Sequence, residues 1–514
     1  MSKVYLVGAG PGDPGLLTVK GLECVRKADV IVYDRLAHPS ILAEARPDAE
    51  MIYVGKASSA HTMKQSDINR LLVDKAKENE VVVRLKGGDP FIFGRGGEEA
   101  ELLVEEGVPF DIVPGISSAI AVPAYAGIPV THRGLCCSLG IVTGHEDPSK
   151  EMSSIRWDKI STGLDTIVFL MGVENLPNIV SQLTSNGRDA STPIALIRWG
   201  TRFEQETLTG TLEDIVGKVE TAGFKSPAVI VVGEVVRLRD KLRWFDNRPL
   251  TGKKIIVTRS REQMSSLSAL LREQGSETIE FPVIAIAPPD DFDKLDKALS
   301  HIEDFDWLLF TSANGVTAVI DRLLDLGLDS RWLKGPKVGA IGPKTMDAIY
   351  NFGISVNFLP SESVAEAVVE EFPENPAGKR ILILNAKDAR DVLQKKLTER
   401  GAKVEVAVAY QTVIEDSNAS DIKDLLVNGD IDFITFTSSS TVSNFIKLIG
   451  KEIATKVPEK TKIVCIGPIT AQTAVELGLA PDIVAENYTV EGMIDALINY
   501  VNTEPAHIKG DSKK

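Results

Sequence analysis

The chain has 514 residues, of which 43% are hydrophobic and 25% charged, a composition that indicates globular domains and excludes a disordered or collagen-like protein. The formal net charge of −15 lacks the basic footprint of a nucleic-acid-binding protein, so we expect no nucleic-acid partner. Four cysteines without CxxC spacing indicate neither a metal site nor a disulfide framework. No apolar run is long enough for a membrane span, and no secretion signal opens the chain, so we expect a cytoplasmic protein.

The chain begins with a short apolar strand and the glycine-rich loop VGAGPGDPGLLT at 7–18. Glycines at this point let the backbone turn sharply and approach a ligand. The residues alone leave two interpretations open, a dinucleotide loop with Asp34 as the ribose-binding acid, or a loop for another adenosyl ligand. Pro11 and Pro14 speak against the dinucleotide, because they stand where its loop needs free amides.

Apolar strand-like runs alternate with helical patterns along almost the whole chain, which predicts an α/β architecture of several domains. The stretch WFDNRPLTGKK holds Pro249 and Gly252 among polar residues, and the new strand KIIVTRS follows it directly. We therefore predict a first domain at 1–246, a linker at 247–252, a second domain at 253–503 and a flexible tail at 504–514.

The second half contains an internal repeat. FDWLLFTSANGV at 305–316 is echoed by IDFITFTSSSTV at 431–442, and GAIGPKT at 339–345 by VCIGPIT at 464–470. Each copy has the pattern strand, Thr/Ser-rich turn, helix, strand, Gly-Pro turn, helix. This predicts two similar lobes with doubly wound parallel sheets, whose strand ends face a shared cleft.

Residues 3–245 resemble the tetrapyrrole methylase family. The resemblance is carried by VGAGPGDPGLLT, VIVYDRL, VGK, RLKGGDPFIFGRGGEE, VPGISSAIAVPAYAGIPVTHRG, FLMGV and SPAVIVVGEVV. Within the family, GGDPFIFGRGGEE and AYAGIPVTHR are similar to uroporphyrinogen-III C-methyltransferases. The resemblance implies a two-lobed methyltransferase that binds S-adenosyl-L-methionine (SAM) between its lobes, transfers two methyl groups to uroporphyrinogen III, and forms a homodimer through this half.

The resemblance also implies a SAM site in several loops. Residue chemistry agrees at Gly87 and Gly88, which allow backbone contact, and at Asp89, which can pair with amino or ribose groups. For Met171, residue type alone favours core filling. The full implied set is Pro11, Gly87, Gly88, Asp89, Ile92, Ser117, Ser118, Met171 and Gly200.

C-methylation of a reduced pyrrole depends mainly on alignment, because its electron-rich ring carbon attacks the sulfonium methyl group directly. The methylated ring must then lose a proton, which calls for a carboxylate base. The resemblance assigns Asp34 as proton acceptor and Lys56 as proton donor, whereas residue type alone favours a strand-end cap and a solvated lysine. Candidate anchors for the polycarboxylic substrate, each equally an ordinary surface residue, are Arg35, Arg95, His132 and Arg133.

Residues from about 252 to 502 resemble uroporphyrinogen-III synthase through FTSANGV, AIGPKT, AYQT, FTSSSTV and CIGPITA. The resemblance implies one lobe at about 253–284 plus 412–503 and another at about 287–409. It implies closure of hydroxymethylbilane with inversion of the last ring, and Tyr410 near the departing hydroxyl. Hydroxyl candidates for the substrate carboxylates are Thr311, Ser312, Ser438, Ser439 and Thr470, with helix N-capping as the other interpretation.

The two resemblances together predict a bifunctional enzyme that makes precorrin-2 from hydroxymethylbilane for sirohaem or cobalamin, with SAM as its cofactor. Two alternatives are an NAD-linked oxidoreductase in the first half and a non-catalytic two-lobed solute-binding module in the second. The pairing of two families with consecutive reactions favours the bifunctional enzyme.

Overall fold

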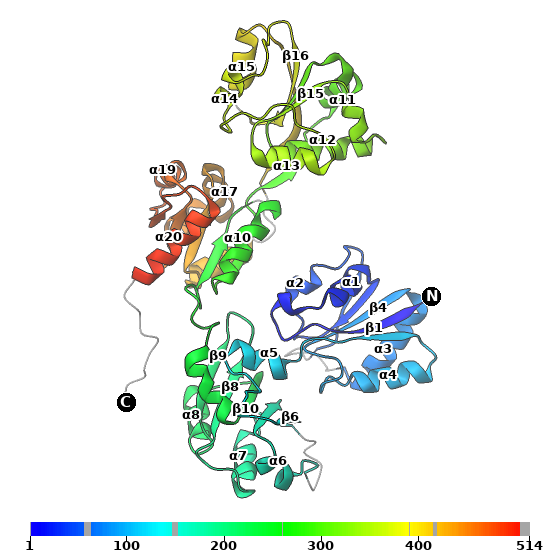
Figure 1. Cartoon of the computed structure of the whole chain (residues 1–514), viewed down its shortest axis with the longest axis vertical. Helices are drawn as coiled ribbons and strands as arrows, with labels where there is room; N and C mark the ends of the chain where they lie inside the picture. The colour runs from blue at the N-terminus through cyan, green and yellow to red at the C-terminus, as the bar shows by residue number, and fades with distance from the viewer. Residues whose placement is uncertain are drawn as a thin grey trace. The chain divides into compact units, whose positions relative to one another are not determined.

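The computed structural model describes residues 2–55, 63–145, 153–259, 261–389, 391–414 and 419–503. The chain divides into two compact units, Met1–Gly252 with Gln274–Ser276, and Lys253–Glu273 with Glu277–Lys514 (Figure 1). Each unit contains two five-stranded sheets with helices packed on them, so the predicted α/β class is confirmed. Within the described ranges, no helix is long and apolar enough to cross a membrane. The predicted tail at 504–514 lies outside these ranges.

The first lobe of the first unit is a parallel sheet in the order β3-β2-β4-β1-β5. Its inner strands are nearly continuous apolar runs such as VIVY, because helices cover both faces. Thr18 caps the first helix by accepting a hydrogen bond from the Gly21 amide at 3.1 Å. The elements are β1 (Lys3–Gly8), η1 (Pro14–Leu16), α1 (Val19–Lys27), β2 (Val30–Tyr33), α2 (Pro39–Leu42), β3 (Glu50–Tyr53), α3 (Gln65–Glu78), β4 (Val81–Lys86), α4 (Gly96–Glu105) and β5 (Phe110–Val113).

The second lobe of this unit has a mixed sheet in the order β6-β7-β10-β8-β9. Strand β6 runs parallel to β7, whereas β10 is antiparallel to both of its neighbours and β9 is antiparallel to β8. Helix α5 packs on this sheet, with Ala119 and Val122 in one core with Leu170 and Val229. The elements are α5 (Ser118–Tyr125), β6 (Leu139–Thr143), α6 (Trp157–Gly163), β7 (Thr166–Leu170), α7 (Leu176–Ser185), β8 (Pro193–Arg198), β9 (Glu206–Thr211), α8 (Ile215–Ala222), β10 (Ala228–Val232), η2 (Glu234–Leu238) and α9 (Arg239–Leu242).

One sheet of the second unit is parallel, in the order β12-β11-β18-β19-β20. Its first strand and its later strands come from distant parts of the sequence, with Ile256 beside Ile434. Its elements are β11 (Lys254–Val257), α10 (Arg261–Glu273), β12 (Glu277–Glu280), α16 (Ala419–Asn428), β18 (Phe433–Phe436), α17 (Ser439–Ile449), α18 (Lys451–Thr455), β19 (Lys462–Cys465), α19 (Pro468–Leu477), β20 (Ile483–Val484) and α20 (Val490–Thr503).

The other sheet of this unit has the order β13-β17-β16-β14-β15. It is parallel except that β13 runs antiparallel to β17. Its elements are β13 (Ala285–Ala287), α11 (Asp293–Ser300), η3 (Ile302–Asp304), β14 (Trp307–Phe310), α12 (Ala313–Asp325), η4 (Ser330–Leu333), β15 (Lys337–Ala340), α13 (Pro343–Asn351), α14 (Ala365–Glu370), β16 (Arg380–Ala386), α15 (Val392–Glu399) and β17 (Lys403–Val413).

The sequence repeat is a repeat of the fold. In one lobe β14 leads into α12 through the N-cap Ser312, and in the other β18 leads into α17 through the N-cap Ser438. Helices α13 and α19 likewise begin at Pro343 and Pro468, each directly after a glycine. Proline at the first helical position fits because its missing N–H has no partner within the helix.

Candidate active site

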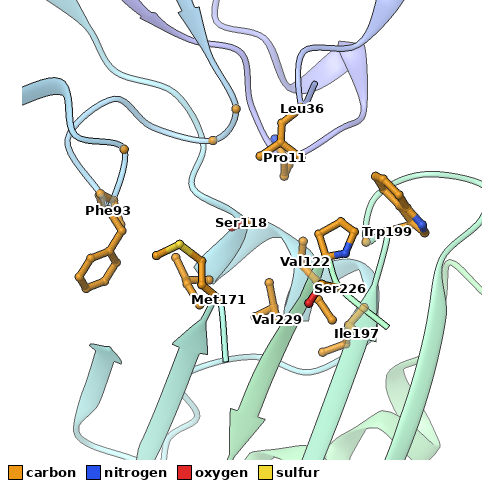
Figure 2. Close-up of a pocket in the computed structure, with 18 of the residues that line it drawn as sticks. Pro11, Leu36, Phe93, Ser118, Val122, Met171, Ile197, Trp199, Ser226 and Val229 are labelled. Carbon is orange, nitrogen blue, oxygen red and sulfur yellow. The ribbon is translucent and has the colours of Figure 1, made fainter. Parts of the chain in front are cut away.

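A pocket of about 420 Å³ lies in the first unit, within the size range of small-molecule sites (Figure 2). Carboxyl ends of parallel strands meet at one edge of a sheet, so the loops after β1, β2 and β4 come together on one side. Those loops contribute Pro11, Leu36 and Gly88 to the wall. Strands β7, β8 and β10 of the second lobe contribute the opposite wall.

Most of the cofactor residues implied by the sequence line this one pocket. Their side chains or backbones come from both lobes and from helix α5, whose first residue is Ser118. The lining residues from the implied set are Pro11, Gly87, Gly88, Ile92, Ser118, Met171 and Gly200.

Asp89 and Ser117 are outside the lining and support the loops. The Asp89 carboxylate accepts hydrogen bonds from the amides of Phe91 at 2.8 Å and Gly115 at 3.0 Å. Ser117 is buried and caps α5, where its hydroxyl accepts from the amide of Ala119 at 3.3 Å. Both side chains therefore shape the segments that carry the pocket residues.

The glycine motifs bring three backbone segments into direct contact. Gly10 and Gly88 form a pair of backbone hydrogen bonds, at 2.7 Å and 3.2 Å, that joins the loops after β1 and β4. A Cβ on Gly115 would collide with the Gly88 carbonyl oxygen and with the Cα of Gly8. Gly8 and Gly115 therefore leave no room for a side chain, whereas Gly10 and Gly88 have positive φ angles of 77° and 69°, which glycine adopts readily.

Strained backbone concentrates around the pocket. Among the described non-glycine residues, positive φ angles occur at Phe93 (50°), Arg95 (59°), Met171 (57°), Trp199 (47°) and Thr201 (72°). The side chains of Phe93 and Trp199 lie on opposite sides of the pocket in Figure 2. Strain of this kind persists only where the surrounding structure holds it, and it clusters at active sites and ligand-binding sites. Met171 is 54% exposed, so core filling is the wrong interpretation of that residue.

The apolar floor of the pocket and several residues of its second-lobe wall were not predicted from the sequence. The floor is apolar, and a polar rim adds ionisable side chains. These unpredicted lining residues include Val122, Ile197, Trp199, Val229, His145, Glu174, Arg202 and Ser226. Apolar strand residues read as ordinary core, and no motif spacing distinguishes them.

Asp34, the implied proton acceptor, lies at the end of β2, two residues before the pocket residue Leu36. Its carboxylate accepts a hydrogen bond from the Leu36 amide at 3.0 Å and lies 3.5 Å from the guanidinium of Arg84. The Asp34 side chain is 26% exposed, so it is held in place and still reaches solvent. Lys56, the implied proton donor, lies outside the described residues.

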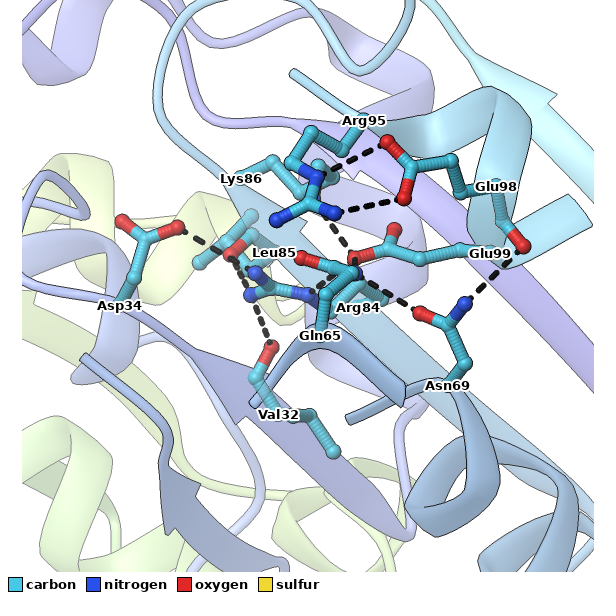
Figure 3. A network of polar contacts seen from close by, with 10 residues as sticks. All are labelled: Val32, Asp34, Gln65, Asn69, Arg84, Leu85, Lys86, Arg95, Glu98 and Glu99. Atoms are coloured by element: carbon cyan, nitrogen blue, oxygen red, sulfur yellow. Dashed lines mark hydrogen bonds and ion pairs between the residues drawn. The ribbon is translucent and has the colours of Figure 1, made fainter. Parts of the chain in front are cut away.

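A buried charge network lies behind Asp34 (Figure 3). One carboxylate oxygen of the fully buried Glu99 accepts hydrogen bonds from Lys86 at 2.7 Å, Arg84 at 3.2 Å and Gln65 at 3.2 Å. Burial lowers the pKa of Lys86, and the neighbouring Arg84 lowers it further against the opposing effect of Glu99. Arg84 thus connects Asp34 to a charge cluster shielded from water.

The four implied substrate anchors are all exposed and lie outside the pocket lining. Arg95 forms a two-pronged ion pair with Glu98, at 2.8 Å and 2.7 Å, which raises the pKa of the guanidinium. It lines a second hollow that also includes Met171. Arg35 directly follows Asp34, while His132 and Arg133 lie in the segment before β6.

In the second unit the structure brings together three implied residues of one lobe. The hydroxyl of Tyr410, a buried residue on β17, lies 3.1 Å from the hydroxyl of Ser312. Ser312 also accepts a hydrogen bond from the Gly315 amide at 3.1 Å, and Thr311 donates to the carbonyl of Leu384 at 3.2 Å. The capping interpretation is therefore confirmed for Ser312, which has a second contact besides.

Two implied residues of the other lobe, Ser438 and Ser439, also have local partners. Ser438 forms a capping box with Thr441, so capping is confirmed there too. Ser439 accepts a hydrogen bond from the Thr473 hydroxyl at 2.7 Å. Thr470 is 5% exposed in the first turn of α19.

The geometry defines a two-part α/β protein, with a small-molecule pocket between two lobes in the first unit and a duplicated α/β fold in the second. The family model described as Tetrapyrrole (Corrin/Porphyrin) Methylases matches residues 3–216, and the model for Uroporphyrinogen-III synthase HemD matches 265–495. The chain therefore belongs to the tetrapyrrole methylases through its first half and to the uroporphyrinogen-III synthases through its second.

One similar protein covers nearly the whole chain, and two others cover just under half of it. The Porphyrin biosynthesis protein HemD of Ruminiclostridium josui is 40% identical, with 96% of this chain and 97% of the relative covered. The Uroporphyrinogen-III C-methyltransferase of Priestia megaterium is 56% identical over 46% of this chain and 99% of its own length. A SAM-dependent uroporphyrinogen III methyltransferase of Methanosarcina barkeri is 53% identical over 47% of this chain and 94% of its own length.

Proposed function

We propose that the chain is a bifunctional enzyme of tetrapyrrole biosynthesis. Its second half closes hydroxymethylbilane to uroporphyrinogen III with inversion of the last ring. Its first half transfers two methyl groups from SAM to that product and yields precorrin-2. The observation that carries the proposal is the presence, in one chain, of two families whose reactions are consecutive.

The pocket of the first unit suits SAM in size and in lining. Gly87 and Gly88 expose backbone groups without side chains, and Ser118 adds a hydroxyl for the polar parts of the cofactor. The apolar floor, with Val122 and Val229, suits an adenine ring. When bound, SAM supplies an electrophilic methyl group. The remaining work of the protein is alignment, exclusion of water and removal of a proton.

Asp34 serves as the base in this proposal. Its carboxylate is oriented by the Leu36 amide and by Arg84, and it adjoins the pocket wall at Leu36. A fixed, partly exposed carboxylate can accept the proton that the methylated ring loses and pass it to solvent. Lys56 is the proposed proton donor of the same reaction.

In the second unit, alignment of a polyanion also dominates, because the hydroxyl of hydroxymethylbilane leaves readily. Tyr410 donates a hydrogen bond to that departing hydroxyl, and Ser312 fixes the direction of the phenol. The hydroxyls proposed to hold substrate carboxylates are those of Thr311, Ser312, Ser438, Ser439 and Thr470. We further propose a cytoplasmic homodimer formed through the methyltransferase half, without a nucleic-acid partner.

The test is incubation of the purified chain with enzymatically generated hydroxymethylbilane, with and without SAM. We expect uroporphyrinogen III without SAM and a product heavier by two methyl groups with it, followed by absorbance and mass. Formation of the type III isomer with no effect of SAM would refute the methyltransferase. Formation of the type I isomer alone would refute the synthase. Sirohaem from the chain with NAD and iron would contradict precorrin-2 as the end product.

A further inference from the structure

Arg202 is held in the pocket wall on three sides. Its guanidinium lies over the ring of Trp199, 5.0 Å from the ring centroid, and its Nη2 donates to the carbonyl of Leu36 at 3.4 Å. The backbone of Gly12 lies so close that a Cβ there would stand 2.9 Å from the Nε of Arg202. Trp199 comes from the second lobe and Leu36 from the first, and Figure 2 shows both at the pocket. This packing orients the guanidinium and leaves most of its donors unused.

The charge of Arg202 is not neutralised by a close carboxylate. Within the described parts of the chain, neither Arg202 nor Arg35 has a carboxylate at ion-pair distance. Burial lowers the pKa of Arg202, Arg35 lowers it further, and Glu204 opposes them through space. Arginine stays charged at any working pH, so Arg202 at the pocket and Arg35, which is near enough to lower its pKa, are two cations from opposite lobes without a carboxylate at ion-pair distance in the described parts of the chain.

The sign of that charge discriminates between the two ligands of the proposed function, on which this argument rests. SAM carries a sulfonium and an ammonium group against one carboxylate, so a pair of cations repels it overall. Uroporphyrinogen III carries a carboxylate on every side chain of its periphery. Guanidinium groups bind carboxylates with paired hydrogen bonds, so the substrate is the ligand that this pair fits.

We propose that Arg202 and Arg35 together bind one peripheral carboxylate of the porphyrinogen substrate. Arg35 directly follows Asp34, so a carboxylate held here anchors the macrocycle beside the proposed base. Arg202 lines the cofactor pocket as well, so the same anchor sets the ring against the methyl donor. Arg202 is thus a substrate-binding residue that selects for an acidic side chain on the macrocycle.

The experiment uses the full chain and the variants Arg202→Gln, Arg202→Lys and Arg237→Gln. For Arg202→Gln we expect the KM for uroporphyrinogen III to rise about 10-fold or more, with kcat changed far less. The Kd for S-adenosylhomocysteine should stay within about twofold, because the anchor does not hold the cofactor. Arg237 is the matched control, since it is exposed and forms an ion pair with Glu234 on η2.

Two further measurements sharpen the test. Added salt should raise the KM of the wild type more steeply than that of Arg202→Gln. The reason is that salt screens the ion pair between Arg202 and the substrate carboxylate, which the variant lacks. The KM of Arg202→Lys should lie between those of the wild type and Arg202→Gln, since lysine keeps the positive charge but lacks the planar guanidinium with its paired N–H donors. Arg35→Gln combined with Arg202→Gln should cost less than the sum of the single changes, because both bind one carboxylate.

The outcomes separate this inference from the function beneath it. A wild-type chain that methylates, together with an unchanged KM in Arg202→Gln, overturns the anchor alone. Loss of S-adenosylhomocysteine binding in Arg202→Gln and Arg202→Lys also overturns it, because Arg202 would then serve the cofactor or the lobe contact. A wild-type chain that does not methylate overturns the proposed methyltransferase, which the anchor presupposes.

Discussion

The two candidate sites differ in the groups that form them, which are backbone segments in the first unit and side-chain hydroxyls in the second. In the first unit, backbone segments joined at Gly10 and Gly88 form a pocket whose lining groups face an open volume. In the second unit, hydroxyls such as Ser312 and Ser438 already serve as helix caps. The first site therefore separates scaffold from ligand contacts. In the second, side chains that cap helices are also the ones proposed to bind substrate, so we expect function and stability to be coupled there.

The largest expected effect tests the buried charges of the first unit. Glu99→Leu removes the carboxylate that Lys86 contacts at 2.7 Å and leaves Lys86 and Arg84 buried without it. Loss of one partner from a buried ionic cluster typically costs about 3–5 kcal/mol of unfolding free energy. Methyl transfer should therefore be inactivated at a clearly lower temperature than in the wild type. Ring closure, measured in the same heated sample, should keep its normal inactivation temperature.

The neighbouring Glu98 provides the matched control. Its ion pair with Arg95 is about half exposed on both sides, so Glu98→Gln should cost less than about 1 kcal/mol. Equal inactivation temperatures for the two variants would show that the Glu99 cluster contributes no more than a surface pair. A parallel fall in the inactivation temperature of ring closure would show that the two units do not unfold separately.

The next effect tests the claim that the first site is built from backbone. Gly115→Ala would force its Cβ against the backbone of Gly8 and Gly88, which cannot give way as a side chain can. A shift of about 1 Å at a catalytic site costs roughly 100-fold in rate, so methyl transfer should fall by that order. Ring closure should be unchanged within about twofold.

Gly217→Ala is the control for that substitution. A Cβ at Gly217 meets nothing within 4 Å, and the residue lies inside α8, where alanine is the better helix former. It should therefore keep full methyl transfer. Normal methyl transfer in Gly115→Ala would contradict the tight glycine contact, and equal losses in both variants would show a general sensitivity to added volume.

The difference between the two sites also explains what the sequence could reveal. The first-lobe loops of the pocket were predictable because glycine and proline mark backbone geometry directly. The strand residues of the second-lobe wall were not predictable, since Ile197 and Val229 look like any buried strand residue. The Glu99 cluster was equally hidden, because the burial of Arg84 arises only when helix α4 packs over β4.

In the second unit, the order of strands and helices was easier to predict from the sequence than the contacts of individual side chains. The repeat correctly predicted matching strand and helix starts, and the alternative interpretation of Ser312 and Ser438 as N-caps is confirmed. The repeat gave no sign that Tyr410 would lie against Ser312, 98 residues away, because β16 brings β17 and β14 into the same sheet. Contacts across a sheet follow from strand order, which local spacing does not encode.

The smallest expected effect compares two helix N-caps, Ser438 and Ser312, of which Ser312 also contacts the Tyr410 hydroxyl. Ser312→Ala and Ser438→Ala should each destabilise the second unit by about 1 kcal/mol, because each removes an N-cap. Only Ser312→Ala should also lower the kcat of ring closure, by roughly 10-fold, since the Tyr410 hydroxyl loses its hydrogen-bond partner. Ser438→Ala should act mainly on the KM for hydroxymethylbilane.

Thr18→Ala supplies the reference for this pair, because it removes a similar cap from α1 in the other unit. It should leave both kcat and KM of ring closure unchanged. Tyr410→Phe should lower kcat as Ser312→Ala does. If the double variant loses no more kcat than either single variant, the two hydroxyls contribute to ring closure through their mutual hydrogen bond. Additive losses would instead mean that Ser312 contributes to ring closure independently of Tyr410, and that its contact with the phenol is incidental to capping.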